Sequence, residues 1–144
     1  MDRRILFMLN RAHHRLNKRA NRELMATSGI SVTQGGALAF LIGNDGCLLK
    51  ELSAGLGLNN SAITGLVERM ERAGLIEKRT CDRDSRSFRV YITQRGLDAA
   101  VNSLSLLKKM NGAIEKSFTS AELDVIARFL NFLADAGNRD VPEG

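Results

Sequence analysis

Apolar residues recur every three or four positions along most of the chain, which is the spacing that one face of an α-helix requires. The predicted helices cover residues 2–25, 33–42 and 94–118, with a final helix after them. Thr33 can cap the second helix, because a short hydroxyl side chain accepts an unpaired backbone N–H of the first turn. Thr119 and Glu122 have the spacing of a capping box and predict the start of the final helix.

Residues 48–96 hold shorter elements. A short helix is followed by a turn that contains Gly57 and by a second helix that Asn59 or Asn60 can cap. The second helix has apolar residues at i, i+3, i+4 and i+7, which form one stripe facing a core: Ile63, Leu66, Val67 and Met70. Gly74 follows as a helix stop in the left-handed conformation.

Two β-rich runs, residues 75–80 and 87–93, come next. The loop expected between them, residues 81–86, reads CDRDSR and presents Arg83 and Arg86. The order helix, turn, helix and β-hairpin is that of a winged helix-turn-helix. This module places its second helix in the major groove of DNA and its hairpin beside it.

The second helix carries small and hydroxylic residues on the face opposite its apolar stripe. Such a face can lie close to base edges, while phosphates lie nearer the periphery. We expect Ser61, Thr64 and Gly65 to face bases. We expect Asn60 and Arg69 to lie nearer phosphates.

Arginine on a hairpin tip suits the minor groove, whose negative potential attracts it. Asp84 stands two residues before Arg86 and can orient its guanidinium through a charge-assisted hydrogen bond. A solvated charged hairpin is the alternative. The predicted DNA-binding residues are Asn60, Ser61, Ala62, Thr64, Gly65, Arg69, Arg83, Asp84 and Arg86.

The sequence resembles the MarR family of bacterial transcription regulators. The matching positions are Leu52, Leu56, Leu58, Ser61, Ile63, Thr64, Val67, Met70, Glu71, Gly74, Leu75, Ile76, Arg79, Asp84, Arg86, Val90, Ile92, Thr93 and Gly96. The family's wing carries Asp followed by two Arg, whereas Asp84 is followed here by Ser85 and Arg86. The family's first acidic wing position falls on Cys81.

The expected fold is mostly α with a small β-hairpin wing. Residues 1–144 form a single regulator chain, with the DNA-binding winged helix-turn-helix over 33–96 and dimerisation helices over 1–28 and 97–136. Pairing these terminal helices between two chains would bury their apolar faces. It would also set two recognition helices about one DNA turn apart, as a palindromic operator requires. The resemblance implies the same homodimer, and an intramolecular helical bundle is the alternative.

A net charge of +5 and a sequence pI of about 9.7 favour an anionic partner. No apolar run approaches the roughly 18 to 20 residues that a membrane span needs, and the N-terminal apolar stretch is too short for a signal peptide. We therefore expect a cytoplasmic protein. We expect no cofactor and no metal, because His13 and His14 are adjacent and point about 100° apart on a helix.

The sequence thus predicts a sequence-specific double-stranded DNA-binding transcription regulator rather than an enzyme, since it shows no nucleophile cluster or acid–base pair. It is expected to be a dimeric repressor that a small-molecule effector releases. The resemblance implies a small aromatic or phenolic ligand where the dimer helices meet the winged domain. The candidate lining is His13, Arg15, Leu16, Asn17 and Phe40.

Two alternatives remain. A winged helix can serve as a protein-interaction module without a regulatory DNA site. The second alternative is a thiol-based, redox-sensing repressor of the same fold. Cys81 lies beside Lys78, Arg79 and Arg83 in the sequence, and positive charges of this kind favour a reactive thiol. Cys47 is expected to be a small packed residue.

Overall fold

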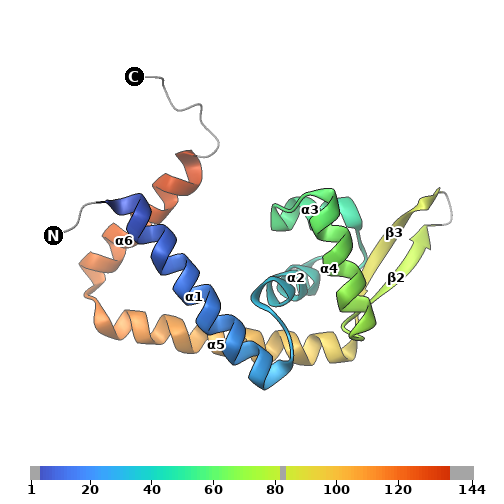
Figure 1. Cartoon of the computed structure of the whole chain (residues 1–144), viewed down its shortest axis with the longest axis horizontal. Helices are drawn as coiled ribbons and strands as arrows, with labels where there is room; N and C mark the ends of the chain where they lie inside the picture. Colours follow the sequence, from blue (N-terminus) through green and yellow to red (C-terminus); the bar gives the residue numbers. More distant parts are fainter. Residues whose placement is uncertain (1–3, 82–83, 137–144) are drawn as a thin grey trace. The chain divides into compact units, whose positions relative to one another are not determined.

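The computed structural model describes residues 4–81 and 84–136, and the side chains of residues 84–86 lie outside that description. In chain order the elements are α1 (Ile5–Ser28), α2 (Val32–Gly43), β1 (Cys47–Leu48), α3 (Leu49–Leu56), α4 (Asn60–Arg72), β2 (Ile76–Cys81), β3 (Asp84–Ile92), α5 (Gln94–Ser117) and α6 (Ser120–Ala136) (Figure 1). The chain divides into two compact units, Met1–Leu106 and Leu107–Gly144. The expected fold, mostly helical with a small β-hairpin wing, is confirmed.

Helix caps follow local hydrogen-bonding chemistry. Ser31, not Thr33, caps α2, because Gln34 stands at the third helical position and completes a capping box with it. Asn59, rather than Asn60, caps α4 by accepting the backbone N–H of Ala62 at 2.9 Å. From the sequence alone, the capping residues of α2 and α4 could be assigned only to within one or two positions.

The predicted capping box at the start of α6 is confirmed. The backbone N–H of Glu122 donates to Oγ1 of Thr119 at 3.3 Å, and the backbone N–H of Thr119 donates to Oε2 of Glu122 at 2.8 Å. This reciprocal pairing satisfies two N–H groups that a helix start otherwise leaves to solvent.

Strand β3 is the centre of a three-stranded antiparallel sheet with the order β1-β3-β2. The sequence did not predict β1, which pairs Cys47 with Val90 and Leu48 with Arg89. The wing strands are also longer than predicted. A register shift after Thr80 lets Cys81 pair with Asp84, which leaves only residues 82–83 between the strands.

The core of the first unit gathers α2, α3, α4 and β3. Its largest fully buried side chains include Leu38, Leu41, Leu52, Ile63 and Met70. All four residues of the predicted α4 stripe are buried: Ile63, Leu66, Val67 and Met70. The stripe therefore fixes which face of α4 remains exposed.

Small residues bring α5 close to the rest of the first unit. Its buried positions are Gly96, Ala99, Ala100 and Ser103, whereas the larger residues Val101 and Leu104 are exposed. A Cβ on Gly96 would collide with the carbonyl oxygen of Leu75 and with Ile92. Only glycine allows this approach of α5 to the end of α4 and the wing.

Thr93 joins three elements at the start of α5. Its hydroxyl donates to the carbonyl oxygen of Gly74 at 2.6 Å, just beyond α4, and accepts the backbone N–H of Gly96 at 3.1 Å. Its own backbone N–H donates to the carbonyl oxygen of Leu75 at 3.1 Å. One residue thus links the end of α4, the end of β3 and the first turn of α5.

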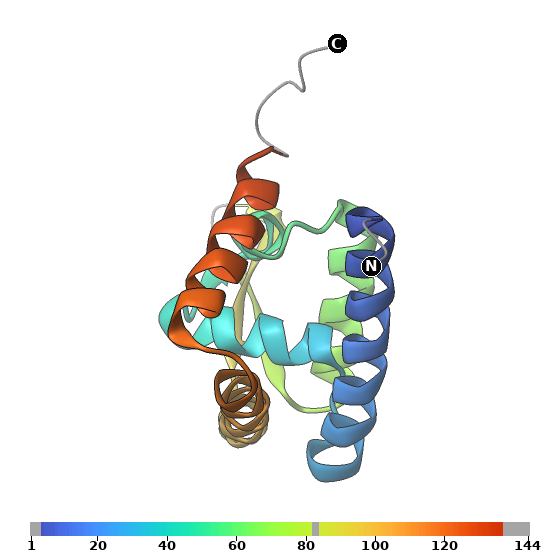
Figure 2. The same cartoon turned by 90° about the vertical axis from the view of Figure 1, so that its left-hand side faces the viewer.

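Helices α1 and α2 meet at a bend of 70° (blue and cyan in Figure 2), and the side chain of Asn21 accepts the backbone N–H of Val32 there at 2.8 Å. Among the described residues, no single helix is long and apolar enough to cross a membrane. The bent pair of α1 and α2 meets that criterion jointly, by length and composition only.

Apolar side chains are exposed on both units. In the first unit they gather at the start of α1: Ile5, Leu6, Phe7 and Met8. In the second unit they lie on the end of α5, at its junction with α6 and on α6: Leu107, Ile114, Phe118, Val125, Leu130 and Phe132.

Candidate nucleic-acid interface

The exposed face of α4 begins with hydroxyl groups whose directions are fixed. The Thr64 hydroxyl donates to the carbonyl oxygen of Asn60 at 2.7 Å, and the Ser61 hydroxyl donates to Oδ1 of Asn59 at 3.1 Å. Both hydroxyls keep acceptor lone pairs for a partner, and Thr64 also offers a methyl group. Base edges present donors and the thymine methyl group, which such a face can meet.

Gly65 and Arg69 continue this face one and two turns further along α4. The position of a Cβ on Gly65 lies 3.1 Å from Nη1 of Arg69, so the guanidinium folds back over the glycine. Asn60, Ser61, Ala62, Thr64 and Arg69 are all exposed. Five of the six residues predicted on this helix are therefore exposed, and Gly65 is partly buried.

A hydrogen bond and an ion pair join the wing to the C-terminal end of α4. The Glu71 carboxylate accepts the backbone N–H of Lys78 at 3.2 Å, and its other oxygen lies 3.5 Å from Lys78 Nζ. The same Nζ lies 5.0 Å from the centre of the Phe88 ring. These contacts hold β2 and β3 beside the C-terminal end of α4.

The opposite face of the wing carries two arginines that pair across the strands, Arg79 and Arg89. Arg79 stacks on Tyr91 at 4.2 Å and lies 3.4 Å from the Glu77 carboxylate. Arg89 donates to the carbonyl oxygen of Gly46 at 2.9 Å. Each guanidinium is thus held by local contacts, which offsets the repulsion between like charges across strands.

The residues predicted at the wing tip are only partly placed. Arg83 lies outside the described residues, as do the side chains of Asp84 and Arg86. The backbone of both Asp84 and Arg86 belongs to β3, so the expectation that they lie on a loop was wrong. The cause is the register shift after Thr80, which extends the ladder to the Cys81–Asp84 pair.

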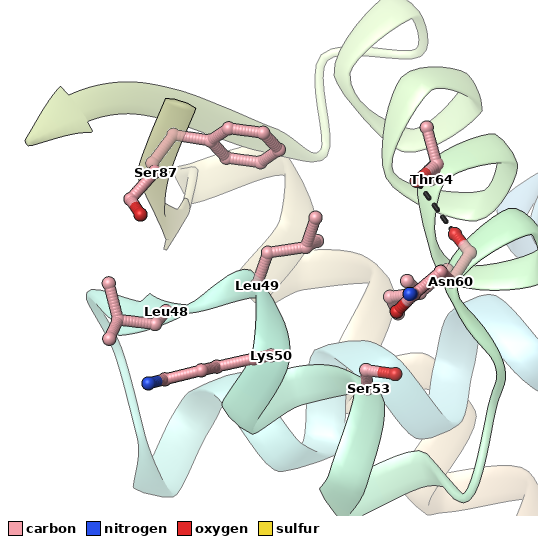
Figure 3. Close-up of a pocket in the computed structure, with 9 residues that line it drawn as sticks. Leu48, Leu49, Lys50, Ser53, Asn60, Thr64 and Ser87 are labelled. Atoms are coloured by element: carbon pink, nitrogen blue, oxygen red, sulfur yellow. Dashed lines mark hydrogen bonds between the residues drawn. The ribbon is translucent and has the colours of Figure 1, made fainter. Parts of the chain in front are cut away.

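A pocket of about 270 Å³ opens between α4 and the wing. Figure 3 shows Leu48, Leu49, Lys50 and Ser53 on one side, Asn60 and Thr64 of α4 on another, and Ser87 of β3 on a third. Ile63 and Phe88 complete the lining. Sequence reasoning did not connect Lys50 or Ser87 with α4. The alternation of β3 was visible, but the pairing of β1 with β3 that brings these parts together was not.

The predicted effector residues lie on two helices. On α1, Nδ2 of Asn17 lies 2.9 Å from Nε2 of His13, while Arg15 and Leu16 are exposed. Phe40 of α2 is partly buried against the core, and a Cβ on Gly55 would collide with its ring. The structure brings His13 and Asn17 together and packs Phe40 against α3.

The two cysteines differ in exposure. Cys47 is buried, and this burial raises the pKa of its thiol, with the Glu51 carboxylate adding to the shift. Its expected role as a packed residue agrees with this setting. Cys81 is partly exposed near the end of β2. Among the described residues, no cluster of three His, Cys, Asp or Glu side chains is arranged to hold a metal ion.

This arrangement of helices, sheet and hairpin defines a winged helix-turn-helix protein. A family model described as "MarR family" matches residues 28–87. A curated relative, the HTH-type transcriptional regulator BilQ of Clostridioides difficile (strain CD3), is 26% identical over 98 residues. That match covers 68% of this chain and 66% of the relative, so it spans slightly less than two thirds of BilQ.

Solved structures give the same fold over nearly the whole chain. The S. aureus MepR–DNA complex has a TM-score of 0.81 at 18% identity and covers 94% of this chain and 98% of that one. A probable transcriptional regulator from Pseudomonas aeruginosa has a TM-score of 0.74 at 25% identity, covering 92% and 98%. A MarR protein from Peptoclostridium difficile has a TM-score of 0.82 at 19% identity, covering 94% and 88%. The match of residues 28–87 and the shared fold agree with the resemblance to the MarR family that the sequence indicated.

Proposed function

We propose that the chain is a sequence-specific regulator that binds a palindromic DNA operator as a homodimer. The observation that carries this proposal is the exposed face of α4, where small and hydroxylic residues stand beside a wing fixed by Glu71 and Lys78. A helix with such a face enters the major groove, and its hairpin lies along the neighbouring minor groove. The structures of MepR and of M. tuberculosis MOSR, both in complex with DNA, support this assignment.

The dimer is supported by the exposed apolar residues of the two units. Leu6 and Phe7 on α1, and Phe118, Leu130 and Phe132 in the second unit, are about half exposed or more in a single chain. Exposed apolar side chains gathered in this way on each unit mark protein–protein contacts. A two-fold pairing of these helices would present two copies of α4 to successive turns of one duplex. A DNA target also places the protein in the cytoplasm.

A small aromatic or phenolic acid is the proposed effector, and its binding would release the operator. The candidate site is formed by His13, Arg15, Leu16 and Asn17 of α1 together with Phe40 of α2. The PcaV regulator of Streptomyces coelicolor, 23% identical to this chain, has a structure in complex with its natural ligand, which supports a ligand-responsive member. The ligand acts only as far as it prefers one spacing of the two recognition helices.

Selection of duplexes from a random pool by the purified full chain tests the function. We expect an inverted repeat whose half-sites are centred about 10 bp apart, bound by a species that sediments as a dimer. Repeating the selection with phenolic acids tests the effector, which should lower the bound fraction. A monomeric protein without duplex preference would overturn the proposal, and a winged-helix interaction module would then be the better assignment.

A further inference from the structure

In the first two turns of α4, the positions opposite the buried stripe are occupied by small residues. Because an α-helix turns by about 100° per residue, Ser61 and Gly65 lie opposite the buried stripe of this helix. Small residues there let the edges of base pairs come close to the helix backbone. Gly65 allows the closest approach, since it has no side chain.

Arg69 uses the space that Gly65 leaves. A Cβ on Gly65 would lie 3.1 Å from Nη1 of Arg69, closer than most real Cβ contacts, and 3.9 Å from its Cζ, an ordinary contact distance. The guanidinium therefore lies back along the outward face of α4, towards its N-terminal half. A longer side chain at position 65 would exclude it from this place.

The guanidinium of Arg69 is also unengaged. Among the residues that the structure describes, Arg69 makes neither an ion pair nor a side-chain hydrogen bond, although Glu68 and Glu71 are close in sequence. Glu71 is instead engaged by Lys78. Arg69 thus keeps its donors for a partner outside the chain, and its fork matches the two acceptors of a guanine edge.

We propose that Gly65 and Arg69 form one specificity-determining unit, in which the glycine lets the guanidinium of Arg69 lie in the groove and donate to O6 and N7 of a guanine. This inference rests on the proposed function. It assigns Arg69 to a base edge, where the sequence led us to expect a phosphate. It also gives Gly65 a role, because the absence of a side chain there leaves room for the guanidinium of Arg69.

The substitution Gly65→Ala tests the unit with Gly36→Ala as a matched control. Gly36 is an exposed glycine within α2, and a Cβ there would meet nothing within 4 Å. Both changes replace glycine by a better helix former, so both should raise Tm by roughly 2–5 °C. Only Gly65→Ala should lower the preference for guanine at one position of each half-site, by roughly 5- to 150-fold.

The double variant Gly65→Ala/Arg69→Ala separates this mechanism from a simple clash between the new methyl group and DNA. If the unit exists, Arg69→Ala alone removes the guanine preference and adding Gly65→Ala changes it no further. If instead the new methyl group clashes with the DNA, the fold-losses of the two single variants should multiply in the double variant. Arg69→Lys keeps the charge without the planar fork and should also lose the guanine preference.

Each outcome has a separate meaning. If the parent chain selects no duplex, the proposed function fails. If the parent selects an operator and Gly65→Ala retains the same base preferences, or Arg69→Ala weakens all sequences equally, the operator function stands and the unit is refuted.

Discussion

The carboxylate of Glu71, in the last turn of α4, accepts the backbone N–H of Lys78 in β2 at 3.2 Å, and its other oxygen lies 3.5 Å from Nζ of the same lysine. The two side chains are 42% and 29% exposed, so solvent screens their attraction and its worth to folding is about 0–1 kcal/mol. The contact also joins the last turn of α4 directly to β2, so it contributes to the position of the wing beside that helix.

We therefore predict that Glu71→Gln weakens operator binding several-fold while Tm changes little. The neutral amide cannot hold the ammonium of Lys78, and the wing loses part of its fixed position. Glu77→Gln is the control, since Glu77 pairs with Arg79 on the exposed face of the same wing at 3.4 Å. Fluorescence anisotropy with a labelled operator measures both variants, and equal losses for the two would show that the Glu71 contact has no positioning role.

At the wing tip, Arg86→Ala is predicted to weaken operator binding by about 1–3 kcal/mol, because a guanidinium leaves the minor groove. Arg86→Lys should restore only part of the affinity, and Asp84→Ala should cause a smaller loss. Ser85→Ala is the neighbouring control. The prediction is tested by operator titration at physiological salt, and unchanged affinity of Arg86→Ala would refute it.

In α5, Gly96→Ala should destabilise the fold by about 1–3 kcal/mol, because the added methyl group meets the Leu75 carbonyl oxygen and Ile92. Gly112→Ala, in the same helix, is the matched control, since a Cβ there meets nothing within 4 Å. That control should be neutral or slightly stabilising. Urea denaturation followed by circular dichroism measures both, and a neutral Gly96→Ala would mean that α5 can move away without cost.

The two cysteines should differ in reactivity. In the native protein, a maleimide reagent should modify the partly exposed Cys81 and spare the buried Cys47, which becomes reactive on unfolding. Mass spectrometry after brief labelling identifies the modified residue. Rapid native labelling of Cys47 would show that its part of the core opens readily.

The raised pKa of Cys47 also predicts a pH dependence. The unfolded thiol titrates near its ordinary value of 9.0, whereas the folded thiol titrates higher, so the folded state binds more protons as the pH passes 9.0. Stability from this group is present below that pH and is lost above it. Cys47→Ala should therefore show a shallower loss of stability between pH 8 and pH 10 than the parent, in urea titrations buffered across about that range.

Sequence patterns predicted the parts of the fold that depend on local chemistry. The α4 stripe, the Thr119–Glu122 capping box and the stop at Gly74, whose φ is 75°, each follow from a few neighbouring residues. The features that were missed depend on distant partners. The strand β1 exists through pairing with Val90, and the length of the wing depends on the register shift after Thr80.

In the candidate site too, features set by local sequence could be predicted and features set by distant partners could not. The exposed residues of α4 could be named because helical periodicity separates them from the buried stripe. The position of the Arg69 guanidinium over Gly65 could not be predicted, because the spacing of residues along a helix does not determine which rotamer a side chain adopts. Nor could the pocket beside Asn60 and Thr64, since it needs the assembled β3 and α3 to enclose it.

The hydroxyl of Thr93 has a mechanical consequence. It holds the carbonyl of Gly74 at the end of α4 and the N–H of Gly96 in the first turn of α5, so the junction resists bending. Thr93→Ala would remove both hydrogen bonds and leave the junction to its backbone pairing and to the close approach of Gly96 to Leu75. The orientation of α4 relative to the first turns of α5 therefore depends in part on one hydroxyl group.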